Sequence, residues 1–287
     1  MTGMTESNAI ATDKIVCAVV IYGTKLTDCE VYQTFIEENL GNIDFLLVFD
    51  NTSTSLYEDI KGVRGEYKYF WNPYNPGLSL NYNKAARFAS ENGCQWLLLL
   101  DQDTSFPKGA YYSYLKGISD HPDIKMFVPI HKISGADKFL SPVNAVKPSS
   151  VNVEPGVFSL DDFDVINSGM LVNVDEFIKV GGYKENVSLD FSDFQFVERF
   201  KVLHNRAVAL NVTCLQNFSN EEKNVKKLLG RFDSYCRNVL NFEYHTSKTR
   251  RKIAYLVVKH TAMLSVRCRS VKPVFILFDN IFKKFRR

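Results

Sequence analysis

The segment at residues 95–103 constrains the fold of this chain more than any other. It reads Gln-Trp-Leu-Leu-Leu-Leu-Asp-Gln-Asp, so five apolar residues run directly into two carboxylates that lie one residue apart. Such a run predicts a strand buried on both faces, as in a parallel sheet. In open α/β sheets, ligands bind outside the carboxyl ends of the strands, where Asp101 and Asp103 would lie. Asp-x-Asp also occurs by chance in loops, but at this position the pair favours a divalent metal ion that carries diphosphate oxygens.

Size and composition exclude several classes of protein. The chain has 287 residues, of which 45% are hydrophobic, enough for one large domain or a domain with an appendage. No apolar run reaches the roughly 18 residues of a membrane-spanning helix. Residues 1–12 are polar and lack the apolar core of a secretion signal, so we expect a flexible leader there. The six cysteines show no zinc-type spacing, which predicts free thiols in a reducing cytoplasm.

Charge is distributed unevenly along the chain. Residues 246–287 contain twelve Lys or Arg residues and one acid, Asp279, and therefore carry +11. Because the formal net charge of the whole chain is +3, residues 1–245 carry −8. A basic tail on an acidic body predicts an anionic partner for the tail. The acidic body argues against nucleic acid as that partner.

Apolar, β-branched segments alternate with helical patterns. Strands are predicted at residues 14–21, 44–49, 67–71, 95–100, 125–130, 164–172 and 207–213. Helices are predicted at residues 27–40 and 191–202, from Leu78 to the stop signal Asn92-Gly93, and from residue 221 onward. Residues 131–160 form a loop-rich stretch of the kind that often carries function. The alternation predicts an α/β fold with a mainly parallel sheet.

Polar residues follow the second predicted strand as well as the fourth. Asp50 ends the second strand, so Asp50 and Asp101 should open onto the same edge of the sheet. Asn75, Gly77 and Asn83 lie between them in sequence. A carboxylate can accept the imide N–H of uracil or thymine, and Asn can contact the base or the ribose. The simpler interpretation of Asp50 is an Asx-type turn.

Three further segments each allow a functional and a structural interpretation. Ser168 and Gly169 interrupt an apolar strand, which marks either the close approach of a ligand or a bulge. Asp193 lies near a predicted helix start, where it is either a helix cap or a general base that takes the proton of an attacking hydroxyl. Arg231 and Arg237 lie on a later helix and either bind a diphosphate or form a solvated face.

Together these pieces resemble family 2 of the glycosyltransferases, of the GT-A fold. The closer resemblance is to the bacterial rhamnosyltransferases that build O-antigen and capsule chains. The matching segments are Val19-Val20-Ile21-Tyr22, Asp50-Asn51-Thr52-Ser53, Asn75-Pro76-Gly77-Leu78, Asn83, Asp101-Gln102-Asp103-Thr104, Asn167-Ser168-Gly169, Asp193 with Arg199, and residues 231–238. They occur in the order of the family and cover residues 14–241.

The resemblance implies an inverting transfer from a nucleotide-sugar that depends on Mn²⁺ or Mg²⁺. It assigns Asp193 as the catalytic base, and Asp101 and Asp103 to the metal ion. The residues that it assigns to the nucleotide-sugar are Tyr22, Asp50, Asn75, Gly77, Asn83, Asp101, Gln102, Ser168, Gly169, Arg199, Arg231 and Arg237. It implies a GT-A catalytic domain at residues 13–220, with a Rossmann-like, mostly parallel sheet flanked by helices, and a basic helical region at residues 221–287.

The chain departs from the family pattern at two positions. Ser192 precedes Asp193 where many relatives have an acid, and Asp190 is a candidate for the missing charge. Many relatives also place a His after the late strand, where this chain has Gln216 and Asn217. These departures support one alternative of another class, a protein that binds a nucleotide-sugar without catalysis. The second departure also concerns metal dependence, because the His of the relatives is a further metal or phosphate ligand.

Residues 272–287 combine aromatic and aliphatic side chains with a cationic end. This pattern suits a helix that lies in a membrane interface, whereas the simpler interpretation is a helix packed on the domain. With the resemblance, it implies a cytoplasmic enzyme held peripherally at the inner face of the membrane. The expected reaction transfers L-rhamnose from dTDP-rhamnose to a lipid-linked or growing surface polysaccharide. The alternative donor is a UDP-hexose or UDP-galactofuranose.

Overall fold

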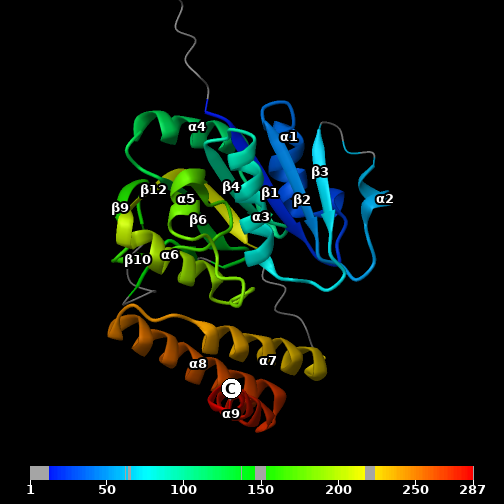
Figure 1. Ribbon diagram of the computed structural model, residues 1–287, viewed down its shortest axis with the longest axis vertical. Coiled ribbons are helices and arrows are strands. Elements are labelled where there is room, and N and C mark those ends of the chain that lie inside the picture. Colours follow the sequence, from blue (N-terminus) through cyan, green and yellow to red (C-terminus); the bar gives the residue numbers. More distant parts are fainter. Residues whose placement is uncertain are drawn as a thin grey trace, which may run out of the picture.

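The computed structural model describes residues 13–61, 63, 66–136, 138–145, 153–216 and 224–286. A sheet flanked by helices forms the larger part, and the last three helices form a layer along one end of it (Figure 1). The leader expected at residues 1–12 and the predicted boundary at residue 220 lie outside the described residues.

Ten strands of the described chain form the main sheet, in the order β3-β2-β1-β4-β11-β6-β12-β5, with β7 paired to β6 and β9 to β12. The strands of this sheet are β1 (Ile15–Ile21), β2 (Phe45–Asp50), β3 (Tyr67–Trp71), β4 (Trp96–Asp101), β5 (Thr104–Ser105), β6 (Met126–Ile133), β7 (Phe139–Ser141), β9 (Gly156–Ser159), β11 (Leu171–Asn173) and β12 (Arg206–Gln216). A separate pair joins β8 (Val143–Asn144) to β10 (Phe163–Asp164).

The parallel part of the sheet brings two predicted strand ends together. β1 lies between β2 and β4, and the three strands run parallel. In this register Ile21 is paired with Asp50, and Val20 is paired with Asp101. The prediction that Asp50 and Asp101 open onto one edge of the sheet is therefore confirmed.

The predicted strand at residues 164–172 is wrong in its middle. Only its ends are strands, and β11 runs antiparallel to both β4 and β6, which makes the sheet mixed. Gly169 has a φ of 68°, and a Cβ at this position would lie 2.7 Å from Pro129. Glycine tolerates this left-handed conformation. The bend brings Asn167 and Ser168 next to the residues that follow β4.

Helices cover both faces of the sheet, as predicted. On one face, α3 (Leu78–Glu91), α5 (Val174–Lys179) and α6 (Ser192–Leu203) pack against alternate residues of β1, β2 and β4. On the other face, α4 (Ala110–Asp120) packs beside the helical segment that follows β1. Both faces of the central strands are therefore buried, as their apolar runs predict.

The helix predicted at residues 27–40 begins later and is irregular. The chain first forms a 3₁₀ turn at Leu26–Asp28, and a π-helix at Tyr32–Ile36 then leads into α1 (Glu37–Asn39). The Val31 N–H donates to the Gln102 carbonyl, so the loop after β4 fixes where this segment starts. A further short helix, α2 (Tyr57–Ile60), lies between β2 and β3.

The C-terminal layer consists of α7 (Val225–Asn241), α8 (Ser247–Cys268) and α9 (Lys272–Phe285). These helices share their own apolar cluster, which Val187 and Phe191 join from the chain before α6. The basic tail is thus helical, as predicted. No helix among the described residues is long and apolar enough to cross a bilayer. All six cysteines are free.

Candidate active site

Asp101 lies at the carboxyl end of β4 and accepts two hydrogen bonds. Tyr82 Oη of α3 and Asn167 Nδ2 each lie 3.0 Å from Asp101 Oδ1. Burial raises the pKa of Asp101 to about 7, and the charge of Asp103 acts in the same direction. The two hydrogen bonds favour the ionised form but do not outweigh burial. Asp101 therefore titrates near neutral pH.

A chain of short hydrogen bonds holds Asp103. Gln216 Nε2, at the end of β12, donates to Asp103 Oδ1 at 2.6 Å, and Thr104 Oγ1 donates to Gln216 Oε1 at 2.6 Å. The Ser168 hydroxyl lies 2.6 Å from Thr104 Oγ1 and donates to it, since the Thr104 proton is already used. Burial raises the pKa of Asp103, whereas Gln216 and the charge of Arg231 oppose the shift. Gln216, one of the two residues expected near the position of the family's His, therefore contacts this carboxylate directly.

His131 supports the other end of this chain of hydrogen bonds. Its Nε2–H donates to the Ser168 carbonyl at 2.8 Å, and the side chain is buried. Burial lowers the pKa of His131 to about 4, so the imidazole is neutral at pH 7. His131 thus fixes the backbone at Ser168 without adding charge near the carboxylates.

Asp193 enters the same region from the first turn of α6. Its Oδ1 accepts a hydrogen bond from the Phe194 N–H at 2.8 Å. Burial raises the pKa of Asp193 to about 7, and the charges of Asp101 and Asp190 raise it further. Phe191 lies between Asp190 and Asp193 with a φ of 68°, a conformation that a bulky residue keeps only where its surroundings hold it there. Backbone strain at this point is typical of a functional site.

Arg231 of α7 supplies a positive charge beside the carboxylates. Its guanidinium lies 3.9 Å from Asp190 Oδ1, and it opposes the rise in pKa that burial causes at Asp190 and Asp103. Asp190 Oδ2 is buried with no hydrogen-bond partner among the described residues. Ser192 donates its hydroxyl to the Leu189 carbonyl at 2.7 Å. The second acid beside Asp193 is therefore Asp190.

Asp50 is withdrawn from the surface. Its carboxylate accepts hydrogen bonds from the N–H groups of Thr52 and Leu56, both at 2.8 Å, and from the Tyr69 hydroxyl. The residue has no exposed surface in this conformation. The Asx-type turn and the tyrosine thus use the carboxylate oxygens, and the contact of Asp50 with the base stays a prediction.

The turn after β3 is held against the loop before α6. Gly77 has a φ of 84°, and a Cβ there would lie 2.3 Å from the Ser188 carbonyl oxygen. Asn75 has a φ of 45° and accepts a hydrogen bond from the Gly77 N–H. Asn83 donates to the Tyr183 carbonyl at 2.8 Å and accepts from the Tyr183 N–H at 2.8 Å. These three predicted site residues therefore position the chain that leads into α6.

Gln102 joins the ends of β1 and β4. The Tyr22 N–H donates to Gln102 Oε1 at 2.8 Å, which leaves the Tyr22 ring largely exposed. The Trp71 ring is also exposed, and its Nε1 donates to the Thr52 carbonyl at 2.9 Å. The Gly23 N–H completes this edge by donating to Thr52 Oγ1 at 2.9 Å. The edge thus carries two exposed aromatic rings next to the loop that Asp50 holds.

Two of the predicted arginines have partners other than Asp101, Asp103, Asp190 and Asp193. Arg199 donates to the Gly182 carbonyl. Arg237 forms an ion pair with Asp233 at 2.9 Å and lines a groove against α9. Since Arg231 and Arg237 are six residues apart on a helix with about 3.6 residues per turn, their side chains leave α7 in different directions. Of these three arginines, Arg231 is the one whose charge acts on Asp190 and Asp103.

Asp101 and Asp103 form the candidate metal-binding pair. Within the described parts of the chain, no three His, Cys, Asp or Glu side chains form a group that could hold a metal ion by themselves. Carboxylates whose pKa values burial raises are stabilised by a cation, and Mg²⁺ is commonly held by one or two carboxylates together with substrate phosphates. The residues present therefore fit a cation that shares its ligands with a diphosphate.

The sequence model described as Glycosyl transferase family 2 matches residues 29–174, half of the chain. The chain belongs to glycosyl transferase family 2. No curated protein matches its sequence.

Solved structures show the fold of this family 2 glycosyltransferase. S. aureus TarS has a TM-score of 0.55 and 12% identity, over 86% of this chain and 43% of that chain. TarS 1–349 in complex with UDP has a TM-score of 0.56 and 13% identity, over 87% and 72%. GalNAc-T7 with UDP, GalNAc and Mn²⁺ has a TM-score of 0.55 and 13% identity, over 92% and 56%. The chain thus spans less than half of TarS, and the expected GT-A fold is confirmed.

Three residues that contact the carboxylates are not among the predicted site residues. Tyr82 belongs to the apolar face of a predicted helix, and its spacing gives no sign that its hydroxyl reaches Asp101. Asn167 stands directly before Ser168 and Gly169, so the polar interruption of the strand was a usable signal. Gln216 could be found only as the residue near the position of the family's His.

Proposed function

We propose that this chain is an inverting glycosyltransferase that moves L-rhamnose from dTDP-rhamnose to a lipid-linked or growing surface polysaccharide. One observation carries the proposal: Asp193 of α6 lies close enough to Asp101 of β4 for the two charges to interact. Family membership supports sugar transfer, and the UDP complexes of TarS and GalNAc-T7 support a nucleotide-sugar donor. A protein that only binds the donor needs no general base, so Asp193 favours catalysis.

Asp193 acts as the general base. It takes the proton of an acceptor hydroxyl while that oxygen bonds to the anomeric carbon, and the nucleoside diphosphate leaves with the electrons of the broken bond. Attack from the face opposite the diphosphate inverts the anomeric centre. A pKa of about 7 suits a base that works near neutral pH. Arg231 adds a positive charge beside Asp103.

Asp101 and Asp103 would hold Mn²⁺ or Mg²⁺. The bound ion supplies Lewis-acid stabilisation of the charge that develops on the departing diphosphate. Gln216 fixes the orientation of Asp103, and Tyr82 with Asn167 fixes that of Asp101. The two carboxylates are thus oriented before the ligand arrives.

The structural neighbours favour one alternative donor. TarS was solved with UDP or UDP-GlcNAc, and GalNAc-T7 with UDP. A UDP-hexose or UDP-galactofuranose is therefore the second candidate. The exposed rings of Tyr22 and Trp71 can stack on either base, and the methyl group that separates thymine from uracil is worth only about 1–3 kcal/mol in an apolar pocket.

The last helix supports a peripheral location at the cytoplasmic face of the membrane. Phe275, Phe278, Phe282 and Phe285 follow one face of α9 at i, i+3, i+7 and i+10, and they are 52–85% exposed. An apolar stripe beside a cationic end is typical of a helix in a membrane interface. A lipid-linked acceptor would be presented at the same surface.

A thermal-shift screen with Mn²⁺ and dTDP, UDP, GDP or CDP tests the proposal. A nucleotide that binds the native chain raises its melting temperature. A shift with dTDP alone supports rhamnose transfer, and a shift with UDP alone moves the proposal to the second donor class. No shift with any nucleotide contradicts both. Release of nucleoside diphosphate from the matching nucleotide-sugar then separates an enzyme from a protein that only binds.

A further inference from the structure

A cavity of about 550 Å³ lies between α6 and the first turns of α8. Phe194, Glu198 and Lys201 line it from one face of α6. Phe194 follows Asp193 directly, and its N–H donates to the Asp193 carboxylate. The cavity therefore lies against the same helix as the proposed general base, and Phe194 in its lining is the residue next to that base in the sequence.

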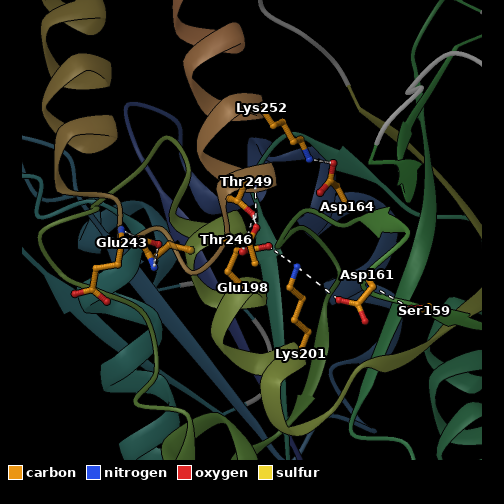
Figure 2. A network of polar contacts seen from close by, with 10 residues as sticks. Ser159, Asp161, Asp164, Glu198, Lys201, Glu243, Thr246, Thr249 and Lys252 are labelled. Atoms are coloured by element: carbon orange, nitrogen blue, oxygen red, sulfur yellow. Dashed lines mark hydrogen bonds and ion pairs between the residues drawn. The ribbon is translucent and has the colours of Figure 1, made fainter.

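Paired charges and hydroxyl groups surround the cavity, and their side chains point toward one another from α6, from α8 and from the loops that carry β9 and β10 (Figure 2). Glu198 accepts a hydrogen bond from Thr249 Oγ1 at 2.9 Å and pairs with Lys201. Lys252 pairs with Asp164, and its ammonium group lies 5.2 Å from the centre of the Phe194 ring. Donors and acceptors are thus held in place around an open space.

The chemistry of the lining favours a neutral polyhydroxyl ligand. Four Lys or Arg side chains face three Asp or Glu side chains, so the charges nearly balance. Carboxylates accept and ammonium groups donate hydrogen bonds, which suits the neighbouring hydroxyl groups of a sugar. Phe194 and Tyr255 add aromatic surface, and the volume lies in the range of small-molecule sites. A diphosphate would find no comparable excess of positive charge here.

We propose that this cavity binds the saccharide acceptor. The sugar unit whose hydroxyl Asp193 deprotonates lies at the Phe194 end, and the adjoining unit occupies the space between Glu198 and Lys252. The proposal rests on the proposed function, because it takes Asp193 as the base. It assigns acceptor recognition to the joint between the sheet and the helical layer, at residues that no sequence motif marks.

Thr249→Phe tests the proposal by filling the cavity from α8. Val258→Phe is the matched control, since Val258 is exposed on the same helix and does not line the cavity. The probes are the methyl glycosides of glucose, galactose, rhamnose and N-acetylglucosamine, and their binding to the full chain is measured by saturation-transfer NMR. We expect Thr249→Phe to weaken binding about tenfold or more, a loss of about 1.4 kcal/mol, and Val258→Phe to leave it unchanged.

The outcomes separate the cavity from the function. Glycosides that bind Thr249→Phe as tightly as the wild type, or that do not bind the wild type at all, overturn the cavity proposal. Glycosides that bind the wild type in this cavity but receive no sugar from any nucleotide-sugar overturn the proposed function instead. The thermal shift with nucleoside diphosphate should persist in Thr249→Phe. That result would show that the variant still binds the nucleotide at the edge of the sheet.

Glu198→Gln provides a second variant if Thr249→Phe does not fold. It keeps the shape of the side chain and removes only its charge, so we expect glycoside binding to weaken severalfold. If Glu198 only stabilises α6 through Lys201 and joins it to α8 through the Thr249 hydroxyl, this variant will lower the melting temperature and leave glycoside affinity unchanged, and that result would contradict the proposal.

Discussion

The edge of the sheet and the last helix differ in which side chains they bury. The edge region buries carboxyl groups, whereas the last helix leaves aromatic rings exposed. At the edge and on the neighbouring first turn of α6, Asp101 and Asp193 are carboxyl groups whose pKa burial raises to about 7. On α9, aromatic side chains such as Phe282 and Phe285 remain exposed to water, next to several cations. One region withdraws charge from solvent, and the other presents apolar surface to it.

Both arrangements cost stability in the isolated chain. Burying a carboxylate removes its hydration, and exposing a ring forgoes the stabilisation that burial would give. Under the proposed function, each cost is offset by a different partner, a cation with a diphosphate at the edge and a lipid surface at α9. The comparison therefore assigns chemistry to the edge and attachment to the helix, and separate variants can test each assignment.

Asp193→Asn should have the largest effect. It should lower kcat about 10²–10⁴-fold, because an amide cannot take the proton of the acceptor hydroxyl. Nucleotide binding, measured as the thermal shift with Mn²⁺, should persist. Asp175→Asn is the matched control, since Asp175 also lies in the first turn of a helix but is exposed. Transfer that survives in Asp193→Asn would assign the base elsewhere, and Asp190 would be the next candidate.

Gly77→Ala should destabilise the edge of the sheet by about 2–4 kcal/mol. The new Cβ would lie 2.3 Å from the Ser188 carbonyl oxygen, and the φ of 84° disfavours any L side chain. Gly93→Ala is the control, because Gly93 has a similar φ of 66° but a Cβ there would meet nothing within 4 Å. Urea unfolding measures both losses. Equal losses would show that the contact with Ser188 contributes nothing.

Much of the fold could be predicted because its central strands carry uninterrupted apolar runs. β1, β2 and β4 are buried on both faces, so their sequences show where each strand ends and which residues share the edge. β11 could not be predicted in the same way. Its direction depends on pairing with β6, which is distant in sequence, and the bend at Gly169 hides where the strand begins.

The acidic residues of the candidate site could be predicted from the sequence, whereas most of the residues that hydrogen-bond to them could not. Carboxylates at strand and helix ends are visible in the sequence, whereas Gln216 reaches Asp103 only after β12 has paired with β6. Asp50 shows that the sequence also hides the internal partners of an acid. Its position suggests a ligand contact, but the Tyr69 hydroxyl from β3 and the loop N–H groups occupy its oxygens.

The stability of the edge should depend on pH in a characteristic direction. Asp101 and Asp193 have pKa values of about 7 in the folded chain, against 3.8 for a solvated carboxyl group, so the folded state binds more protons between these values. Stability therefore falls as pH rises from about 4 to 7, by at most about 1.4 kcal/mol per pH unit for each group. Melting curves in a chelator should show a shallower fall for Asp101→Asn. Parallel curves for wild type and variant would mean that Asp101 is not buried.

The smallest effect should come from α9, where each side chain contributes only part of an attachment. Phe282→Ser should weaken binding to phosphatidylglycerol vesicles by about 1–2 kcal/mol, roughly tenfold, because one exposed ring no longer enters the interface. Tyr112→Ser is the control, since Tyr112 is a similarly exposed aromatic residue, on α4. Vesicle sedimentation measures the binding of both variants, and the thermal shift with nucleotide should be the same in each variant.

If both substitutions weaken binding equally, the chain binds lipid through scattered aromatic residues. That result would contradict the assignment of membrane attachment to α9. If only Phe282→Ser weakens binding, and added salt weakens it further, the stripe and the cations of α9 act together, as their placement on one helix requires.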